Sequence, residues 1–402
     1  MLRTHTCSNG VRIVAEPLPN VQSVALGLWI KTGSRHETAS QNGMSHFLEH
    51  MMFKGTPTRS AKEIAAFFDR IGGEVNAYTS KEYTCFHARV LGTHAKATID
   101  VLADMFLNSS FDEGEIEKEK KVVTEEIKMY EDTPDDLVHD VLMEASYRDH
   151  PLGRPILGTV NTVKQFSKST LTAFQKKHYT PSNVVISIAG NYDDAVLAQL
   201  EEGFGSFTVS GNEAFEAQTP AFEGLTLERT KDTEQAHLCL GYEGVPINDK
   251  RIFPMSIVNN HLGGSMSSRL FQKIREDLGL AYSVFSYHSS FADVGLLTIY
   301  AGTGSEQLEQ LRDVIDHCLT TLTNGLTEDE LLMQKEQLKG HLLLSMEGTG
   351  SHMQRNGKNE LLLGKHRTNE ELIQLINNVT LDDCHTLIEQ VFKGKKATAI
   401  VT

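Results

Sequence analysis

Hydrophobic and polar positions vary along the first third of the chain in the patterns that strands and amphipathic helices require. Residues 23–35 (SVALGLWIKTGSR) and 83–91 (YTCFHARVL) predict strands, because β-branched and aromatic residues gather there between polar segments. Residues 60–73 predict a helix that two glycines end. Residues 112–132 predict a longer helix that ends before Pro134.

The segment 208–224 interrupts this succession of strands and helices. It has no clear hydrophobic period and contains several turn-forming residues. A chain of 402 residues also exceeds one ordinary hydrophobic core. We therefore expect a first domain over residues 1–210, a linker over 211–224 and a second domain over 225–402.

The second half repeats the first in outline. Residues 235–246 resemble the opening strand, and residues 326–347 resemble the helix that begins near residue 111, which sets an offset of 215 residues. The predicted fold is α+β, with two similar domains from an internal duplication, each a mostly antiparallel β-sheet packed with helices.

The segment 43–56 (GMSHFLEHMMFKGT) places His46, Glu49 and His50 within five consecutive positions. Residues three and four apart share one face of a helix, so both imidazoles can point at one zinc ion. Glu49 is close enough to that face to act on water without being a ligand, and H-x-x-E-H inverts the common zincin order. The apolar neighbours predict burial, and buried polar groups need partners.

Catalytic zinc needs a third protein ligand, and the helix at 112–132 is the expected donor. At about 100° per residue, Glu119 and Glu126 fall at the edge of its apolar face, whereas Glu117 and Glu125 point away. One of the two edge glutamates can bind the metal while the other orients a ligand.

The offset of 215 residues shows what the second half has lost. It carries His46 to His261, Glu49 to Gly264, His50 to Ser265 and Glu126 to His341. We therefore expect one working site per chain, in the first domain.

Motifs along nearly the whole chain now identify a family. These motifs are HFLEH with Glu126-Ile127 further on, GGEVNAYTSKEYT (72–84), HPLGRPILGT (150–159) and SSRLFQKIREDLGLAYSV (267–284). Through them the chain resembles the pitrilysin (inverzincin) family of zinc peptidases, in the branch of mitochondrial processing peptidase and its bacterial relatives. The resemblance implies one zinc ion per chain, held by His46, His50 and Glu126. It implies Glu49 as the base that activates water, with Glu119 in contact with the site.

The resemblance also implies how a substrate is held. Asn76 and Ala77 lie in a predicted edge strand to which an extended peptide can add. Arg275 and Tyr282, from the inactive domain, would contact the peptide. Family members of this length pair two chains, so we expect a homodimer that encloses a chamber and admits short or unfolded peptides.

Three alternatives to a broad zinc endopeptidase stay open. The enzyme could remove leader or targeting peptides, although HLGGSMSSR has only two adjacent glycines, unlike the long glycine-rich loop of the processing peptidase's partner subunit. The chain could be a scaffold subunit, but those relatives typically have broken metal motifs. A zinc-stabilised binding module would need a fourth ligand, which the sequence does not provide.

Composition adds expectations about partners and compartment. The formal charge of −15 argues against nucleic acid, and no apolar run is long enough to span a membrane. The opening residues contain no apolar h-region and therefore predict no secretory signal. The five scattered cysteines fit a reducing compartment, so we expect a cytoplasmic protein.

Overall fold

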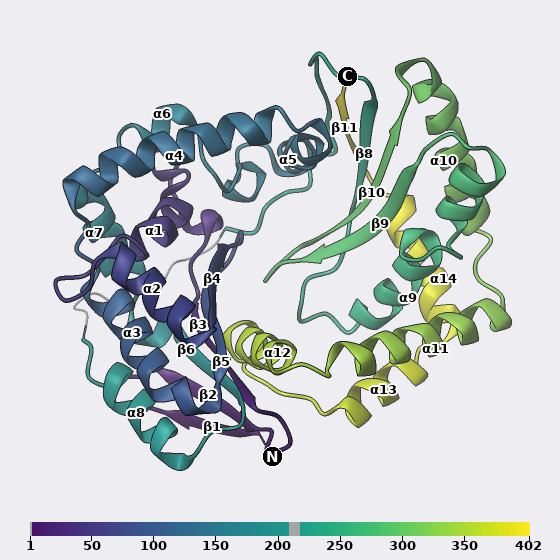
Figure 1. Ribbon diagram of the computed structural model, residues 1–402. Helices are drawn as coiled ribbons and strands as arrows, with labels where there is room; N and C mark the ends of the chain where they lie inside the picture. Colours follow the sequence, from purple (N-terminus) through teal and green to yellow (C-terminus); the bar gives the residue numbers. More distant parts are fainter. Residues whose placement is uncertain (1, 209–217) are drawn as a thin grey trace. The chain divides into compact units, whose positions relative to one another are not determined.

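A computed structural model describes residues 2–208 and 218–402 (Figure 1). Contacts between residues divide the chain into two compact units. The first unit contains the described residues of 1–127, 155–217 and 345–366, and the second contains those of 128–154, 218–344 and 367–402.

In the first unit, six of the described strands form one sheet in the order β1-β2-β6-β3-β5-β4. Neighbouring strands in it are antiparallel, apart from the parallel pair of β2 and β6. The strands are β1 (Arg3–Thr6), β2 (Arg12–Pro17), β3 (Ser23–Ile30), β4 (Glu74–Thr79), β5 (Thr84–Leu91) and β6 (Val184–Gly190).

Helices cover both faces of this sheet. They are α1 (Met44–Met52), α2 (Ala61–Ile71), α3 (Ala95–Asn108), α4 (Glu113–Glu131), α6 (Val160–Val163), α7 (Lys168–His178), α8 (Asp194–Phe204) and α12 (Thr349–Leu362). Side chains alternate along β3: Leu26 and Leu28 join the core beneath α1 and α3, whereas Trp29 packs with Met353 of α12. Continuous burial of β3 therefore follows from two covered faces.

The second unit has a sheet of five described strands in the order β7-β11-β8-β10-β9. These strands are β7 (Thr226–Arg229), β8 (Ala236–Glu243), β9 (Ser283–Ser290), β10 (Gly295–Thr303) and β11 (Lys396–Val401). Its helices are α5 (Pro134–Tyr147), α9 (Ile252–Gly263), the π-helix η6 (Phe271–Asp277), α10 (Leu308–Leu322), α11 (Glu328–Ser345), α13 (Asn369–Asn377) and α14 (Leu381–Phe392).

The two sheets confirm the predicted duplication. The order β2-β6-β3-β5-β4 in the first unit has the same connectivity as β7-β11-β8-β10-β9 in the second. In both, the first pair is parallel and the other pairs are antiparallel. The fold is α+β, as the sequence predicted.

The units differ from the contiguous domains expected at 1–210 and 225–402. Helix α5, from the first half of the chain, packs on β8 and β11, where Leu142 and Ala145 meet Cys239 and Ala399. Helix α12, from the second half, packs on β3 and β6. An amphipathic helix needs an apolar surface, and its sequence does not specify which sheet provides it. Of the expected linker, residues 211–217 lie outside the described residues.

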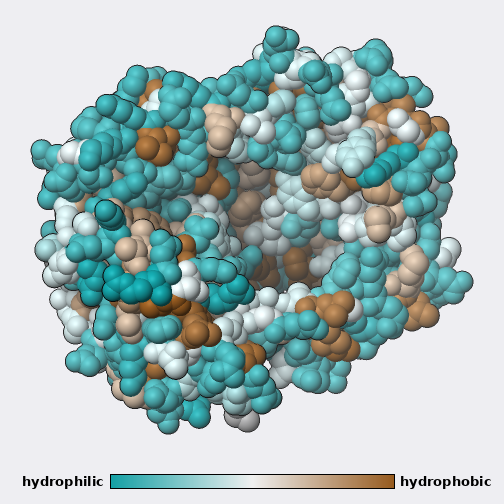
Figure 2. All heavy atoms as spheres, viewed as in Figure 1, coloured by the Kyte–Doolittle hydropathy of each residue, from teal (hydrophilic) through white to brown (hydrophobic). Residues whose placement is uncertain are grey.

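Residues 253–276 belong to two separate helical elements. Helix α9 ends at Gly263, and η6 follows after a turn. No helix among the described residues is long and apolar enough to cross a membrane. Figure 2 shows that hydrophilic residues cover most of the visible surface and that hydrophobic residues form small patches.

Candidate metal centre

Helix α1 carries His46, Glu49 and His50 and is held firmly at its start. Gly43 precedes it with φ of 93°, and a Cβ there would lie 2.6 Å from the Leu157 carbonyl oxygen, so only glycine fits. The first backbone N–H groups of a helix lack partners within the helix. The buried carboxylate of Glu37 accepts hydrogen bonds from two of them, Gly43 N–H at 2.8 Å and Ser45 N–H at 2.7 Å.

The two histidines and Glu126 converge on one point. The Nε2 atoms of His46 and His50 lie 3.2 Å apart, and carboxylate oxygens of Glu126 lie 3.7 Å from each. The three ligand atoms are all within 4.8 Å of one another. Atoms bound at about 2.05 Å in a tetrahedron are separated by about 3.3 Å, so the geometry fits one zinc ion with a position left for water.

Glu119 supports this arrangement from α4. It is buried, and its Oε1 lies 2.7 Å from Nδ1 of His50. Because a carboxylate only accepts hydrogen bonds, Nδ1 of His50 carries the proton and Nε2 is free to bind metal. The other carboxylate oxygen of Glu119, Oε2, lies 2.6 Å from the ammonium of Lys54. The sequence had not indicated a role for Lys54.

The two edge glutamates of α4 thus divide the tasks that the sequence left open. Glu126 is among the potential ligands and Glu119 contacts a ligand. Glu117 instead pairs with Lys120 at 2.7 Å and is 68% exposed. The position of each glutamate around the helix was enough to separate Glu119 and Glu126, which face the site, from Glu117, which does not.

Burial and neighbouring charges set the protonation of the site. Burial, with the neighbouring His50, lowers the pKa of His46 to about 3, so His46 is neutral as a ligand must be. Burial opposes the charged form of His50, but the hydrogen bond to Glu119 and the charge of Glu126 outweigh it and raise the pKa of His50. Burial also raises the pKa of Glu49.

Glu49 is held by a residue that the sequence analysis did not single out. Its Oε2 accepts a hydrogen bond of 2.6 Å from the Thr79 hydroxyl, at the end of β4. Thr79 lies inside the GGEVNAYTSKEYT motif, two positions after Ala77. That position was the available signal, but nothing in the strand pattern showed that its side chain reaches α1.

Asn76 and Ala77 lie on β4, at the edge of the first sheet. Asn76 is exposed, and its Oδ1 accepts a hydrogen bond of 2.8 Å from the N–H of Ala77. The side chain of Asn76 thereby satisfies a main-chain donor of the edge strand. An incoming strand could use the same donor.

Arg275 and Tyr282 belong to the second unit. The guanidinium of Arg275 lies over two rings, 4.8 Å from the centroid of Phe271 and 4.5 Å from that of Tyr282. Arg275 also donates a hydrogen bond of 3.1 Å to the carbonyl oxygen of Tyr282. Arg275 sits on the π-helix η6, and such helices are frequent at functional sites.

The second unit contains remnants of the motif but no comparable cluster. Nε2 of His261 accepts a hydrogen bond of 2.7 Å from Arg269, and His341 is exposed. At the same offset, the buried Glu119 corresponds to Gln334, which is also buried. Among the residues that the structure describes, His46, His50 and Glu126 form the one cluster that could hold a metal ion.

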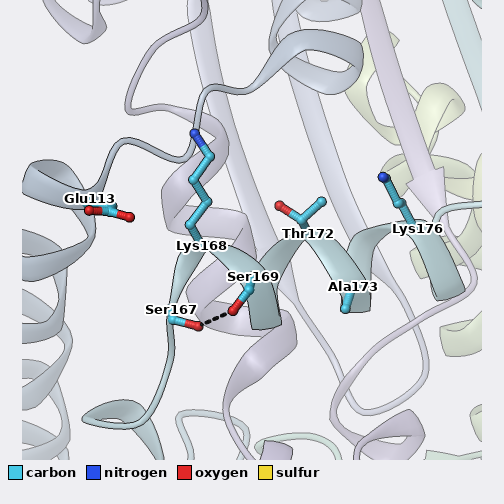
Figure 3. A pocket seen from close by; sticks show the side chains of 7 residues that line it. All are labelled: Glu113, Ser167, Lys168, Ser169, Thr172, Ala173 and Lys176. Carbon is cyan, nitrogen blue, oxygen red and sulfur yellow. Dashed lines mark hydrogen bonds between the residues drawn. The ribbon is translucent and has the colours of Figure 1, made fainter.

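A depression on the first unit lies apart from these residues. It is lined by Glu113 at the start of α4 and by residues along α7 and just before it, among them Lys168 and Lys176 (Figure 3). None of the candidate ligands lines it. We assign it no part in the site.

Two family models match the chain. The model described as "Insulinase (Peptidase family M16)" matches residues 12–160, and that described as "Peptidase M16 inactive domain" matches residues 165–338. The second match agrees with the absence of a metal-binding cluster among the described residues of the second unit.

Relatives cover the chain from end to end. A Bacillus subtilis (strain 168) protein named "Uncharacterized zinc protease YmxG" is 56% identical, over 100% of this chain and 98% of its own length. An "Uncharacterized zinc protease" of Rickettsia felis is 41% identical, over 98% of this chain and 95% of its own length. The crystal structure of a protease from Helicobacter pylori superposes with a TM-score of 0.93 at 22% identity, covering 100% of this chain and 99% of that one, which establishes similarity of fold.

Proposed function

The chain belongs to the insulinase family of peptidases, family M16, and on that premise we propose that it is a zinc-dependent endopeptidase acting on short or unfolded peptides. One observation carries the proposal: the potential ligand atoms of His46, His50 and Glu126 lie within 4.8 Å of one another. Two imidazoles and a carboxylate are a typical catalytic zinc set.

Zinc bound there would supply Lewis acidity, which makes water a stronger nucleophile and polarises the scissile carbonyl. Glu49, next to the ligands but outside their set, takes the proton from the attacking water and delivers it to the leaving amine. Glu119 holds His50 in the orientation that presents Nε2, through the contact of 2.7 Å.

The peptide would bind as an added strand on the edge of β4. Main-chain hydrogen bonds to Asn76 and Ala77 would hold it with little regard to side chains, which suits unfolded substrates. Arg275 and Tyr282 would contact the same peptide from the second unit. The support for these two roles is the family resemblance and, for Arg275, its ordered position over the Tyr282 ring.

We further propose a homodimer that encloses the peptide in a chamber, in the cytoplasm. Sedimentation of the purified protein tests the dimer. A species with twice the mass of one chain is expected at micromolar concentration, and a monomer that still cleaves peptides would remove the chamber from the proposal.

Digestion of a mixed peptide library by the zinc-loaded protein tests the activity. Cleavage at many sequences, lost with a chelator and restored by zinc, is the expected result. Cleavage of a single type of site would favour leader-peptide processing. No cleavage by folded, zinc-loaded protein would refute the endopeptidase and favour a scaffold role.

A further inference from the structure

We propose that Thr79 is a positioning residue for peptide hydrolysis: its hydroxyl fixes the carboxylate of Glu49 and joins that base to the strand on which the peptide docks. This inference rests on the proposed function. It assigns a role to a side chain that the metal site itself does not require.

The contact is direct and short. The Thr79 hydroxyl donates to Oε2 of Glu49 at 2.6 Å, a distance typical of a hydrogen bond to a charged oxygen. Among the described residues, no other hydrogen bond or ion pair engages the Glu49 carboxylate. One oxygen is therefore tied and the other is left to accept the proton of water.

The tether matters because Glu49 would otherwise have rotational freedom. A base assists hydrolysis only when its oxygen is within hydrogen-bond reach of the proton it removes. A glutamate side chain has several rotatable bonds, and one fixed hydrogen bond selects the productive orientation before the substrate arrives.

The segment that follows Thr79 is fixed to the segment that precedes α1. Ser34 N–H donates to the Ser80 carbonyl oxygen at 3.2 Å, and Arg35 N–H donates to that of Lys81 at 2.7 Å. The buried pair of Arg35 and Glu82, at 2.8 Å, reinforces this connection. A Cβ at Gly33 would lie 2.1 Å from the Ser80 carbonyl oxygen, so the two segments approach as closely as glycine permits.

Thr79 also ends the candidate docking strand, two positions after Ala77. The same short stretch of backbone, the end of β4, would therefore position both the bound peptide and the carboxylate of Glu49. This explains why a β-branched hydroxyl residue suits the position: it favours the strand and supplies the donor.

Thr79→Val tests the inference because it keeps the shape and removes the donor, and Thr79→Ser is its conservative partner. Steady-state hydrolysis of one quenched fluorescent peptide should show kcat about 10- to 100-fold lower for Thr79→Val, the loss expected for one hydrogen bond to a charged group. The KM value and zinc content should stay within about twofold of wild type. Thr79→Ser should retain most of the activity.

Thr84→Val is the matched control. Thr84 faces Thr79 across the strand pair, but its hydroxyl donates to the Thr32 carbonyl oxygen at 2.9 Å, away from Glu49. The Thr84→Val substitution should lower the stability of the protein while leaving kcat close to the wild-type value. Thr79→Ala serves as a second donor-free variant in case Thr79→Val does not fold.

The inference is overturned if a folded donor-free variant keeps wild-type kcat, if Thr79→Ser loses as much as Thr79→Val, or if the loss lies only in KM or zinc content. Absence of hydrolysis by wild-type protein is a different result. It would refute the proposed function, and the inference with it.

Discussion

Oε1 of Glu119 lies 2.7 Å from Nδ1 of His50, on the side of the imidazole opposite the candidate metal position. Such a contact fixes the ring and makes it a better ligand. We predict that Glu119→Gln lowers zinc affinity about 10- to 100-fold, as is typical for a partner of a metal ligand.

Competition with a chromogenic zinc chelator measures this affinity. Glu117→Gln is the control. It removes the same charge from the same helix, at a side chain that is 68% exposed. Equal zinc affinities for the two variants would show that the contact with His50 has no effect on the metal.

Glu49→Gln should separate metal binding from catalysis. Gln keeps the size of the side chain but cannot accept the proton of water, so kcat should fall by about 10²–10⁴. Zinc content, measured by plasma emission spectrometry, should stay at one ion per chain. Undiminished cleavage by the zinc-loaded variant would remove Glu49 from the mechanism.

We predict that Glu37 makes the stability of the first unit depend on pH. Burial raises the pKa of Glu37 to about 7, against the opposing hydrogen bonds from Ser45, Gly43 and Asn42. A raised carboxyl pKa means that the stability is full below about pH 4.3, the unfolded value, and is lost as the pH rises through about 7. The loss amounts to about 4 kcal/mol at most.

Glu37→Gln has no such titration. Urea unfolding at pH 5 and at pH 8 should therefore show the variant gaining stability relative to wild type at the higher pH. An unchanged difference between the two pH values, or a reversed one, would contradict the assignment to Glu37.

Arg275→Ala should weaken peptide binding. The guanidinium is ordered by the ring of Tyr282, 4.5 Å away, and this ring belongs to a residue that is 78% exposed and free to meet a ligand. We expect KM to rise about tenfold, as loss of one hydrogen bond to a peptide group implies, with zinc content unchanged. Arg312→Ala, at an exposed pair with Glu309, is the control. Equal KM values for the two variants would argue against a substrate role for Arg275.

The sequence predicted those parts of the site that depend on helical periodicity. His46, Glu49 and His50 are close in sequence, so one helix brings them together, and the face of α4 selected Glu119 and Glu126. Thr79 and Lys54 were missed because their contacts depend on how α1 packs against β4 and α4, which periodicity does not describe.

The two sheets were predicted in outline from alternating patterns, and their shared connectivity confirmed the duplication. The exchange of α5 and α12 between the halves of the chain was not predicted. Both helices have apolar residues for a sheet to cover, and two similar sheets offer similar surfaces, so the choice depends on packing details. Gly357, for example, lies so near the indole of Trp29 that a Cβ would be 2.0 Å away.

The location of bound zinc tests the central claim most directly. Crystals of the zinc-loaded protein, measured at the zinc absorption edge, should show one anomalous peak per chain, about 2.0–2.2 Å from Nε2 of His46, Nε2 of His50 and an oxygen of Glu126. A peak at other residues, with these three left without metal, would contradict the account.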